Sequence, residues 1–194
     1  MLIDRYTNII RGLFAGHSHE DTFQLMKGIY DTKTTGITFV HPALTTYRMS
    51  NPSFRVYEVD PKTYALIDYI QYRLYIDKAD KEDKAVWEVV YRFSESHGVE
   101  TLDYKHFPGI IEKIGKDRKK FENFTKMMYS EGPRGLKLFN APNSQEFIRC
   151  RLYSSDIYEY QKCIGFMFVN IEYFFGYAIY SRFFNLPWSY VLEP

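Results

Sequence analysis

Residues 64–76 read Tyr64-Ala-Leu-Ile-Asp-Tyr-Ile-Gln-Tyr-Arg-Leu-Tyr-Ile76. Polar and apolar side chains alternate along this stretch, which is typical of a β-strand with one face toward water. Turn-forming residues such as those at 31–36 and 60–62 separate it from earlier runs of the same kind. These runs lie at 23–30, 36–40 and 54–59. The pattern predicts consecutive antiparallel strands of one sheet within residues 1–76.

Beyond residue 77 the apolar side chains recur at intervals of three and four, which is typical of amphipathic helices. A first helix, ending at Gly98, is predicted by the apolar positions Ala85, Val86, Val89, Val90 and Phe93. Further helices are expected over 107–114, 118–129 and 144–163. Strands followed by helices indicate an α+β fold, with a domain boundary near residue 77.

The composition is that of a chain able to bury a core. Of its 194 residues 45% are hydrophobic and 25% charged, which excludes a disordered tail. The net charge of +1 gives no field that would attract nucleic acid, so no such partner is expected. Aromatic residues reach 19%, so aromatic rings are expected to supply much of the buried area.

The two ends of the chain differ in character. The first residues place Asp4 and Arg5 where a secretory signal would have its apolar run, so no signal peptide is visible. We expect either an abrupt start or the rear portion of a longer protein. Residues 164–181 carry a single charge, Glu172. Three interpretations of this segment stay open: a membrane-spanning helix, an aromatic helix packed on the body, and a segment lying on a lipid surface.

The chemically richest motif is Gly16-His17-Ser18-His19, which follows an apolar run. In an extended chain, residues two apart project from the same side, roughly 6.6 Å apart by rise. Two such imidazoles can each bind one metal of a pair about 3.5–4 Å apart, and Gly16 permits the tight backbone that brings both rings over the strand end. On these residues alone, two surface histidines in a turn remain the alternative.

The surrounding sequence resembles a known family. The stretch Gly12-Leu-Phe-Ala-Gly-His-Ser-His-Glu-Asp-Thr-Phe23 is similar to the Gly-His-x-His block of the calcineurin-like metallophosphoesterases, specifically the acid sphingomyelinase and sphingomyelinase-like phosphodiesterase branch. Thr45-Thr-Tyr47 and Asn51-Pro-Ser-Phe-Arg-Val-Tyr57 resemble that branch's Thr-Thr-Tyr and Asn-Pro-x-Arg/Phe-Arg-Val-Tyr runs. The similarity covers about residues 1–163.

The resemblance implies an organisation and a reaction. Residues 1–76 would form the C-terminal part of a metallophosphoesterase β-sandwich, 77–163 a helical C-terminal subdomain, and 164–194 an aromatic tail. In that family two zinc ions hold a bridging hydroxide and polarise the phosphoryl oxygens. His17 matches the ligand of one metal and His19 the ligand of the other.

The resemblance also shows what this chain lacks. The family's remaining metal ligands and its proton donor lie upstream, and no Asp-x-His, Gly-Asp or Gly-Asn-His occurs in the 194 residues. A catalytic zinc usually has three protein ligands, so the isolated chain should bind metal weakly and not turn over substrate. We expect the C-terminal portion of a phosphodiesterase that hydrolyses sphingomyelin-like phosphodiesters, by resemblance to ceramide and phosphocholine. The alternative is a non-enzymatic module that binds a lipid surface or a protein through residues 164–190.

Other residues carry secondary expectations. Tyr47 matches a position near the substrate mouth, and Cys150 and Cys163 fit the place of the family's late bridged cysteines, although two reduced cysteines in a core stay an alternative. Asn123 begins an Asn-x-Thr glycosylation sequon. The resemblance implies a secreted, lysosomal or other endomembrane location. His41 either lines the cleft or is a hydrogen-bonded loop or core histidine.

Overall fold

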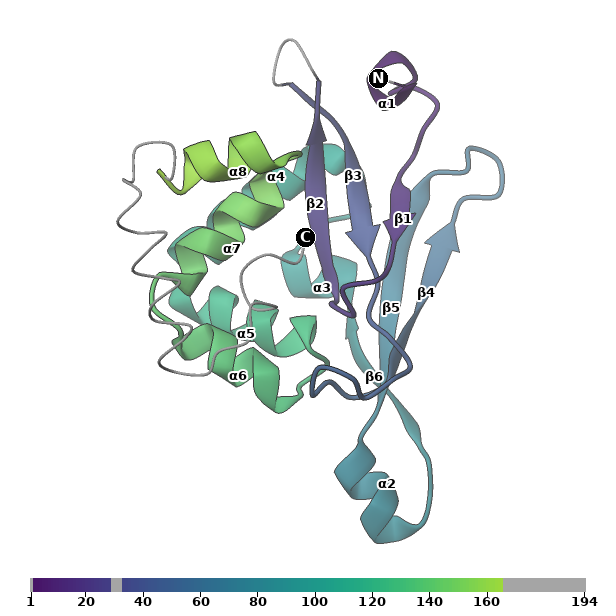
Figure 1. Ribbon diagram of the computed structural model, residues 1–194. Coiled ribbons are helices and arrows are strands. Elements are labelled where there is room, and N and C mark those ends of the chain that lie inside the picture. The colour runs from purple at the N-terminus through teal and green to yellow at the C-terminus, as the bar shows by residue number, and fades with distance from the viewer. Residues whose placement is uncertain (1, 29–32, 166–194) are drawn as a thin grey trace.

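The structure, a computed structural model, describes residues 2–28 and 33–165. In this part of the chain the strands form two three-stranded sheets, ordered β1-β3-β2 and β4-β5-β6. The first sheet contains β1 (Leu13–Ala15), β2 (Thr22–Lys27) and β3 (Thr34–Val40). The second contains β4 (Ser53–Val59), β5 (Leu66–Leu74) and β6 (Trp87–Arg92). The expected mixture of helices and strands is therefore confirmed (Figure 1).

Short helices accompany the strands and longer ones follow them. The short ones are α1 (Leu2–Arg5), α2 (Ile76–Glu82) and α3 (Phe93–His97). A 3-10 turn, η1 (Tyr104–His106), leads into α4 (Phe107–Lys116), α5 (Arg118–Met128), α6 (Pro133–Asn140), α7 (Ser144–Tyr153) and α8 (Ile157–Cys163). Figure 1 shows α4 to α8 gathered on the β2 side of the molecule, away from β4, and α7 packs against β2.

The expectation of one antiparallel sheet is wrong. β1 runs parallel to β3, with Phe14 opposite Phe39, whereas β2 pairs antiparallel with the other edge of β3. β4 begins a separate antiparallel sheet, in which Tyr57 lies opposite Tyr69. Alternation along a strand shows which side chains share a face, but it does not show which strand lies next to it. The order of the strands could therefore not be predicted from the sequence.

The predicted helix over residues 85–93 is also wrong, because most of it is β6. This strand pairs antiparallel with β5, placing Trp87 opposite Leu74. Its β-branched and aromatic side chains suit a half-buried sheet surface. Gly98 does end a helix as expected, with φ 67 in the left-handed region, but that helix is the short α3. Strands thus continue beyond residue 77, and the domain limits themselves stay a prediction.

The helix expected over 144–163 is divided in two. The Asp156 side chain accepts a hydrogen bond from the Glu159 backbone N–H at 2.9 Å, which starts α8 as a separate helix. The Ser154 hydroxyl instead donates to the Cys150 carbonyl at the end of α7. Capping side chains at Ser154 and Asp156 therefore interrupt the single helix that the sequence predicts over residues 144–163. The helices expected near 107–114 and 118–129 are confirmed as α4 and α5.

One aromatic core joins the two sheets to the helices. The ring of Phe39 in β3 contacts Tyr57 and Tyr69 of the second sheet, at centroid distances of 5.7 and 6.3 Å. The Phe39 ring also contacts Phe107 of α4, at 5.8 Å. Phe107 in turn contacts Phe23 of β2, at 4.8 Å. Edge-to-face rings bury large areas in a defined geometry, so aromatic rings supply much of the buried area where the two sheets meet the helices.

Candidate metal centre

The predicted histidine pair lies on the loop between β1 and β2. His17 is exposed and His19 partly buried. Both have positive φ, 75° and 58°, so neither is extended and the alternation argument does not apply to them. Gly16 has no such φ and has open space where a Cβ would be, so the turn does not depend on this glycine. Positive φ is uncommon for non-glycine residues and is concentrated at functional sites.

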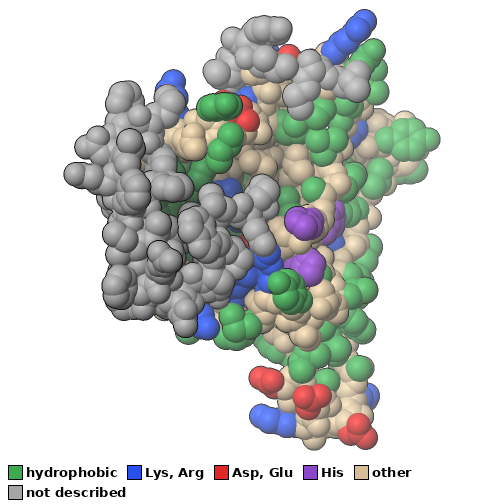
Figure 2. Space-filling model, viewed as in Figure 1, with side chains coloured by type: hydrophobic (Ala, Val, Ile, Leu, Met, Phe, Trp, Pro, Cys, Tyr) green, Lys and Arg blue, Asp and Glu red, His purple; other side chains and the backbone are tan. Residues whose placement is uncertain are grey.

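Tyr47 lies beside this histidine loop, although it is far along the chain. The rings of His19 and Tyr47 meet edge to face with centroids 5.8 Å apart. The Tyr47 side chain is 66% exposed, so one face of this aromatic pair is open to solvent. Figure 2 shows histidine side chains exposed on the viewed face, with apolar and basic side chains next to them. The structure thus brings together two of the residues predicted for the site.

One ring nitrogen of the loop, Nδ1 of His19, is suited to binding a metal. The Nδ1 atom of His19 is buried, and the described residues offer it no hydrogen-bond partner; the same holds for the hydroxyls of Ser18 and Thr22. A buried polar atom without a partner is costly and calls for an explanation. Neutral imidazole nitrogen is a common ligand for zinc. The loop therefore fits part of a metal-ligand set.

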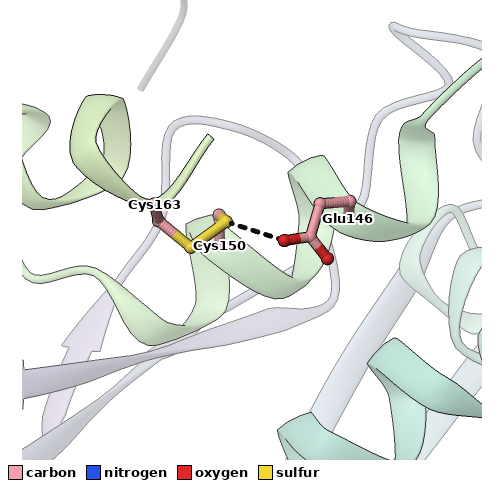
Figure 3. A group of neighbouring side chains, drawn as sticks. All are labelled: Glu146, Cys150 and Cys163. Atoms are coloured by element: carbon pink, nitrogen blue, oxygen red, sulfur yellow. Dashed lines mark hydrogen bonds between the residues drawn. A yellow bond between two sulfur atoms is a disulfide. The ribbon is translucent and has the colours of Figure 1, made fainter. Parts of the chain in front are cut away.

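A complete ligand set is not present around the histidines within residues 2–28 and 33–165. The group of three potential ligands found there is elsewhere, at Glu146, Cys150 and Cys163. Figure 3 shows that the two sulfur atoms are joined in a disulfide, with the Glu146 carboxylate near Cys150. Because disulfide sulfur has no thiolate to offer, this group is a crosslink between α7 and α8. The predicted cysteine bridge is thus present.

His41 has both ring nitrogens engaged. Its Nδ1 lies 2.9 Å from the Ala15 carbonyl oxygen, and its Nε2 lies 3.0 Å from the Tyr57 hydroxyl. Burial lowers the pKa of His41, although the bond to Ala15 opposes this effect. A neutral ring with one donor and one acceptor nitrogen satisfies both contacts. His41 is therefore the hydrogen-bonded histidine of the two alternatives.

The sequence interpretation missed two acidic residues that end the histidine loop. Glu20 accepts hydrogen bonds from the Tyr129 hydroxyl and from Arg151, both at 2.6 Å. Asp21 forms an ion pair with Arg55, and both side chains are almost completely buried. The available signal was two adjacent acids directly after the motif, followed by the apolar strand β2. Buried charges in proteins are generally paired, so these acids predicted buried basic partners.

The remaining predicted positions are remote from the histidines in sequence. Asn123 is exposed on α5, whereas Thr125 of the same sequon is fully buried. The segment 164–194 falls outside the described residues from 166 onward, so its three interpretations are untested. Among residues 2–28 and 33–165, no helix combines the length and the apolar character needed to cross a bilayer.

Comparison with known proteins gives the family context of the residues that follow the histidine loop. Residues 33–169 match the family described as acid sphingomyelin phosphodiesterase C-terminal region. Sphingomyelin phosphodiesterase 1 of Caenorhabditis elegans is 30% identical over 128 residues, 63% of this chain and 22% of that protein. The human cyclic GMP-AMP phosphodiesterase SMPDL3A is 23% identical over 182 residues, 89% of this chain and 39% of that protein. Bovine sphingomyelin phosphodiesterase is 27% identical over 140 residues, 68% of this chain and 22% of that protein. The chain thus spans well under half the length of these relatives.

Proposed function

The chain belongs to the family of acid sphingomyelin phosphodiesterase C-terminal regions, and on this premise we propose that it is the C-terminal portion of a two-metal phosphodiesterase. The family match covers residues 33–169, and the histidine loop lies just before it. One observation carries the proposal: His17 and His19 share a short loop on which the His19 Nδ1 is buried without a partner among the described residues. A metal ligand is the simplest role for such an atom.

Zinc is the proposed metal, with His17 binding one ion and His19 the other. Two zinc ions would supply an activated hydroxide and would polarise the phosphoryl oxygens. Within this chain, the two imidazoles bind and Tyr47 borders the site on its solvent side, as expected for a residue at the substrate mouth. No Asp-x-His, Gly-Asp or Gly-Asn-His occurs in the sequence. The isolated chain is therefore proposed to bind zinc weakly and to have no hydrolytic activity.

The proposed substrate is a sphingomyelin-like phosphodiester. Relatives named for sphingomyelin and for cyclic GMP-AMP both match this chain, and the two substrates share a phosphodiester group. The Cys150–Cys163 disulfide supports folding in the oxidising secretory route, which leads to the lysosome or the extracellular space. N-glycosylation at the exposed Asn123 would agree with that route.

The ligand assignment is tested by zinc titration of the full chain. His17→Ala and His19→Ala should each weaken zinc binding, measured by calorimetry, by about tenfold or more, because each removes a direct ligand. The matched control is His106→Ala, since His106 is an exposed histidine in η1. Equal affinity in all four proteins would refute the assignment and would favour a non-enzymatic binding module.

A second experiment tests the reaction. The chain is joined to an upstream segment bearing the Asp-x-His and Asn-His motifs, and cleavage of a sphingomyelin-like phosphodiester is measured. We expect hydrolysis in the joined protein and its loss in the His17→Ala and His19→Ala variants. Full activity in those variants would contradict the proposal.

A further inference from the structure

The two ends of the histidine loop are connected through one buried side chain, Arg55. Arg55 belongs to β4, and its side chain has no exposed surface. The Cζ atom of its guanidinium lies over the ring of Tyr69, 3.8 Å from the ring centroid. The planar fork of arginine presents several N–H donors in fixed directions, so one buried arginine can hold two separate groups.

The C-terminal end of the loop is held directly. Arg55 Nη2 donates to Oδ1 of Asp21. The other carboxylate oxygen of Asp21 accepts from the Tyr91 hydroxyl at 2.7 Å, and the Asp21 backbone N–H donates to the Met128 carbonyl at 2.9 Å. Asp21 is therefore fixed through its side chain and its backbone, two residues after His19.

The N-terminal end of the loop is held through a relay. Arg55 Nη1 donates to the Tyr57 hydroxyl at 3.0 Å, so the proton of that hydroxyl is free to point at Nε2 of His41, also at 3.0 Å. His41 then carries its proton on Nδ1 and donates it to the Ala15 carbonyl at 2.9 Å. The same carbonyl accepts the His41 backbone N–H. The directions follow because arginine can only donate and a carbonyl can only accept, so that Nδ1 of the neutral ring carries the proton and Nε2 accepts from Tyr57.

The backbone of the loop explains why such support is needed. His17 and His19 both have positive φ, a conformation that costs free energy and persists only where the surroundings enforce it. Gly16 does not supply the turn. Ala15 and Asp21, the residues that bracket the loop, are the ones connected through Arg55.

We propose that Arg55 is a positioning residue for the metal-binding histidines, because it joins both ends of their loop. The inference rests on the proposed function for its significance, but not for its geometry. Arg55 touches neither histidine ring in the contacts given above, so its effect on metal binding passes through Asp21 and through Tyr57.

The experiment compares two tyrosine variants of the full chain. Tyr57→Phe removes the hydroxyl that connects Arg55 to His41. Tyr75→Phe is the control, because the Tyr75 hydroxyl donates to Glu131 and not to Arg55, Asp21 or His41. Zinc affinity, urea unfolding and the NMR order parameters of the amides of residues 16–19 are measured for both. Arg55→Lys, which keeps the charge but not the fork, is the third variant.

Each tyrosine variant loses the hydrogen bonds of one hydroxyl and should stay folded. Tyr57→Phe should lower the order parameters of the loop and weaken zinc binding by about tenfold, whereas Tyr75→Phe should change neither. Arg55→Lys should also lower the order parameters of the loop, because lysine keeps the charge but cannot donate to Asp21 and Tyr57 in the same fixed directions. Equal effects of Tyr57→Phe and Tyr75→Phe, or an unchanged loop in Tyr57→Phe, would overturn the proposal. If the wild-type chain binds no zinc through His17 and His19, the proposed function fails, and the order parameters still decide the role of Arg55.

Discussion

At the scale of single residues, the histidine loop shows that backbone conformation can be set by distant side chains. The sequence assigned the turn to Gly16, yet the residues with positive φ are His17 and His19. Glycine is required elsewhere in the vicinity. A Cβ on Gly132 would collide with the carbonyl oxygen of Met49, on the loop that carries Tyr47. The close approach of these two backbones holds that loop against the start of α6.

Two alanine substitutions separate these cases. Gly132→Ala should destabilise the chain by about 1–3 kcal/mol, because the obstructing atoms belong to the backbone and cannot rotate away. Gly16→Ala should change the free energy of unfolding by less than about 0.5 kcal/mol, since nothing lies near its Cβ position. Urea unfolding of both variants measures the difference. A large loss of stability in Gly16→Ala would show that the turn does depend on this glycine, as the sequence predicts.

At the scale of elements, α7 connects the histidine loop to the end of the described chain. Arg151 of α7 pairs with Glu20 of the loop, and Cys150 is bonded to Cys163 of α8. α8 itself is seven residues long and has no buried residue. Isolated helices of this length are not stable in water, so α8 depends on its links to the body. One further link is the ion pair between Glu159 and Lys27 of β2, at 3.2 Å.

Removing the disulfide should therefore unfold α8 and leave α7 in place. In the variant Cys150→Ala with Cys163→Ser, amide hydrogen exchange should lose its protection over residues 157–163 and keep it over 144–153. Glu159→Gln serves as the control, because it removes the ion pair alone and such partly exposed pairs contribute about 0–1 kcal/mol. A loss of about 3 kcal/mol in global stability, as a closed loop of this length permits, would show instead that α8 unfolds together with the core.

At the scale of the whole molecule, stability and pH are linked through a histidine outside the site. The ring of His97 packs against Phe93, with centroids 4.3 Å apart and the ring planes tilted by 41°. Burial, aided by the charges of Lys120 and Lys113, lowers the pKa of His97 to about 4 from its ordinary 6.5. Between these two values the unfolded chain binds a proton that the folded chain does not. The free energy of unfolding should therefore fall as the pH drops from about 6.5 to about 4.

His97→Phe tests this dependence, because phenylalanine keeps an aromatic ring against Phe93 and cannot be protonated. We expect the wild type to lose about 2 kcal/mol more stability than the variant between pH 7 and pH 4, measured by urea unfolding at a series of pH values. Parallel pH profiles for the two proteins would show that His97 does not control acid stability. This loss of stability at low pH is relevant because the protein is proposed to work in an endomembrane compartment, and some of these compartments are acidic.

Several features of the protein could be read from the sequence alone. These are the α+β class, most strands, α4, α5, the stop at Gly98 and the family to which the chain belongs. Each depends on local periodicity or on a contiguous motif, which are properties of neighbouring residues. The histidine pair is of the same kind, because both histidines lie in one tetrapeptide.

Only the tertiary structure decided what surrounds that tetrapeptide. The parallel pairing of β1 with β3, the strand β6 in place of a helix, and the contact of Tyr47 with His19 all join residues distant in sequence. Arg55 is the sharpest case. Along β4, the apolar Phe54 and Val56 face outward, while Arg55 and Tyr57 face the interior. Hydrophobic alternation alone would invert this strand, because the gain from pairing a buried guanidinium with Asp21 becomes visible only once the two segments are folded together.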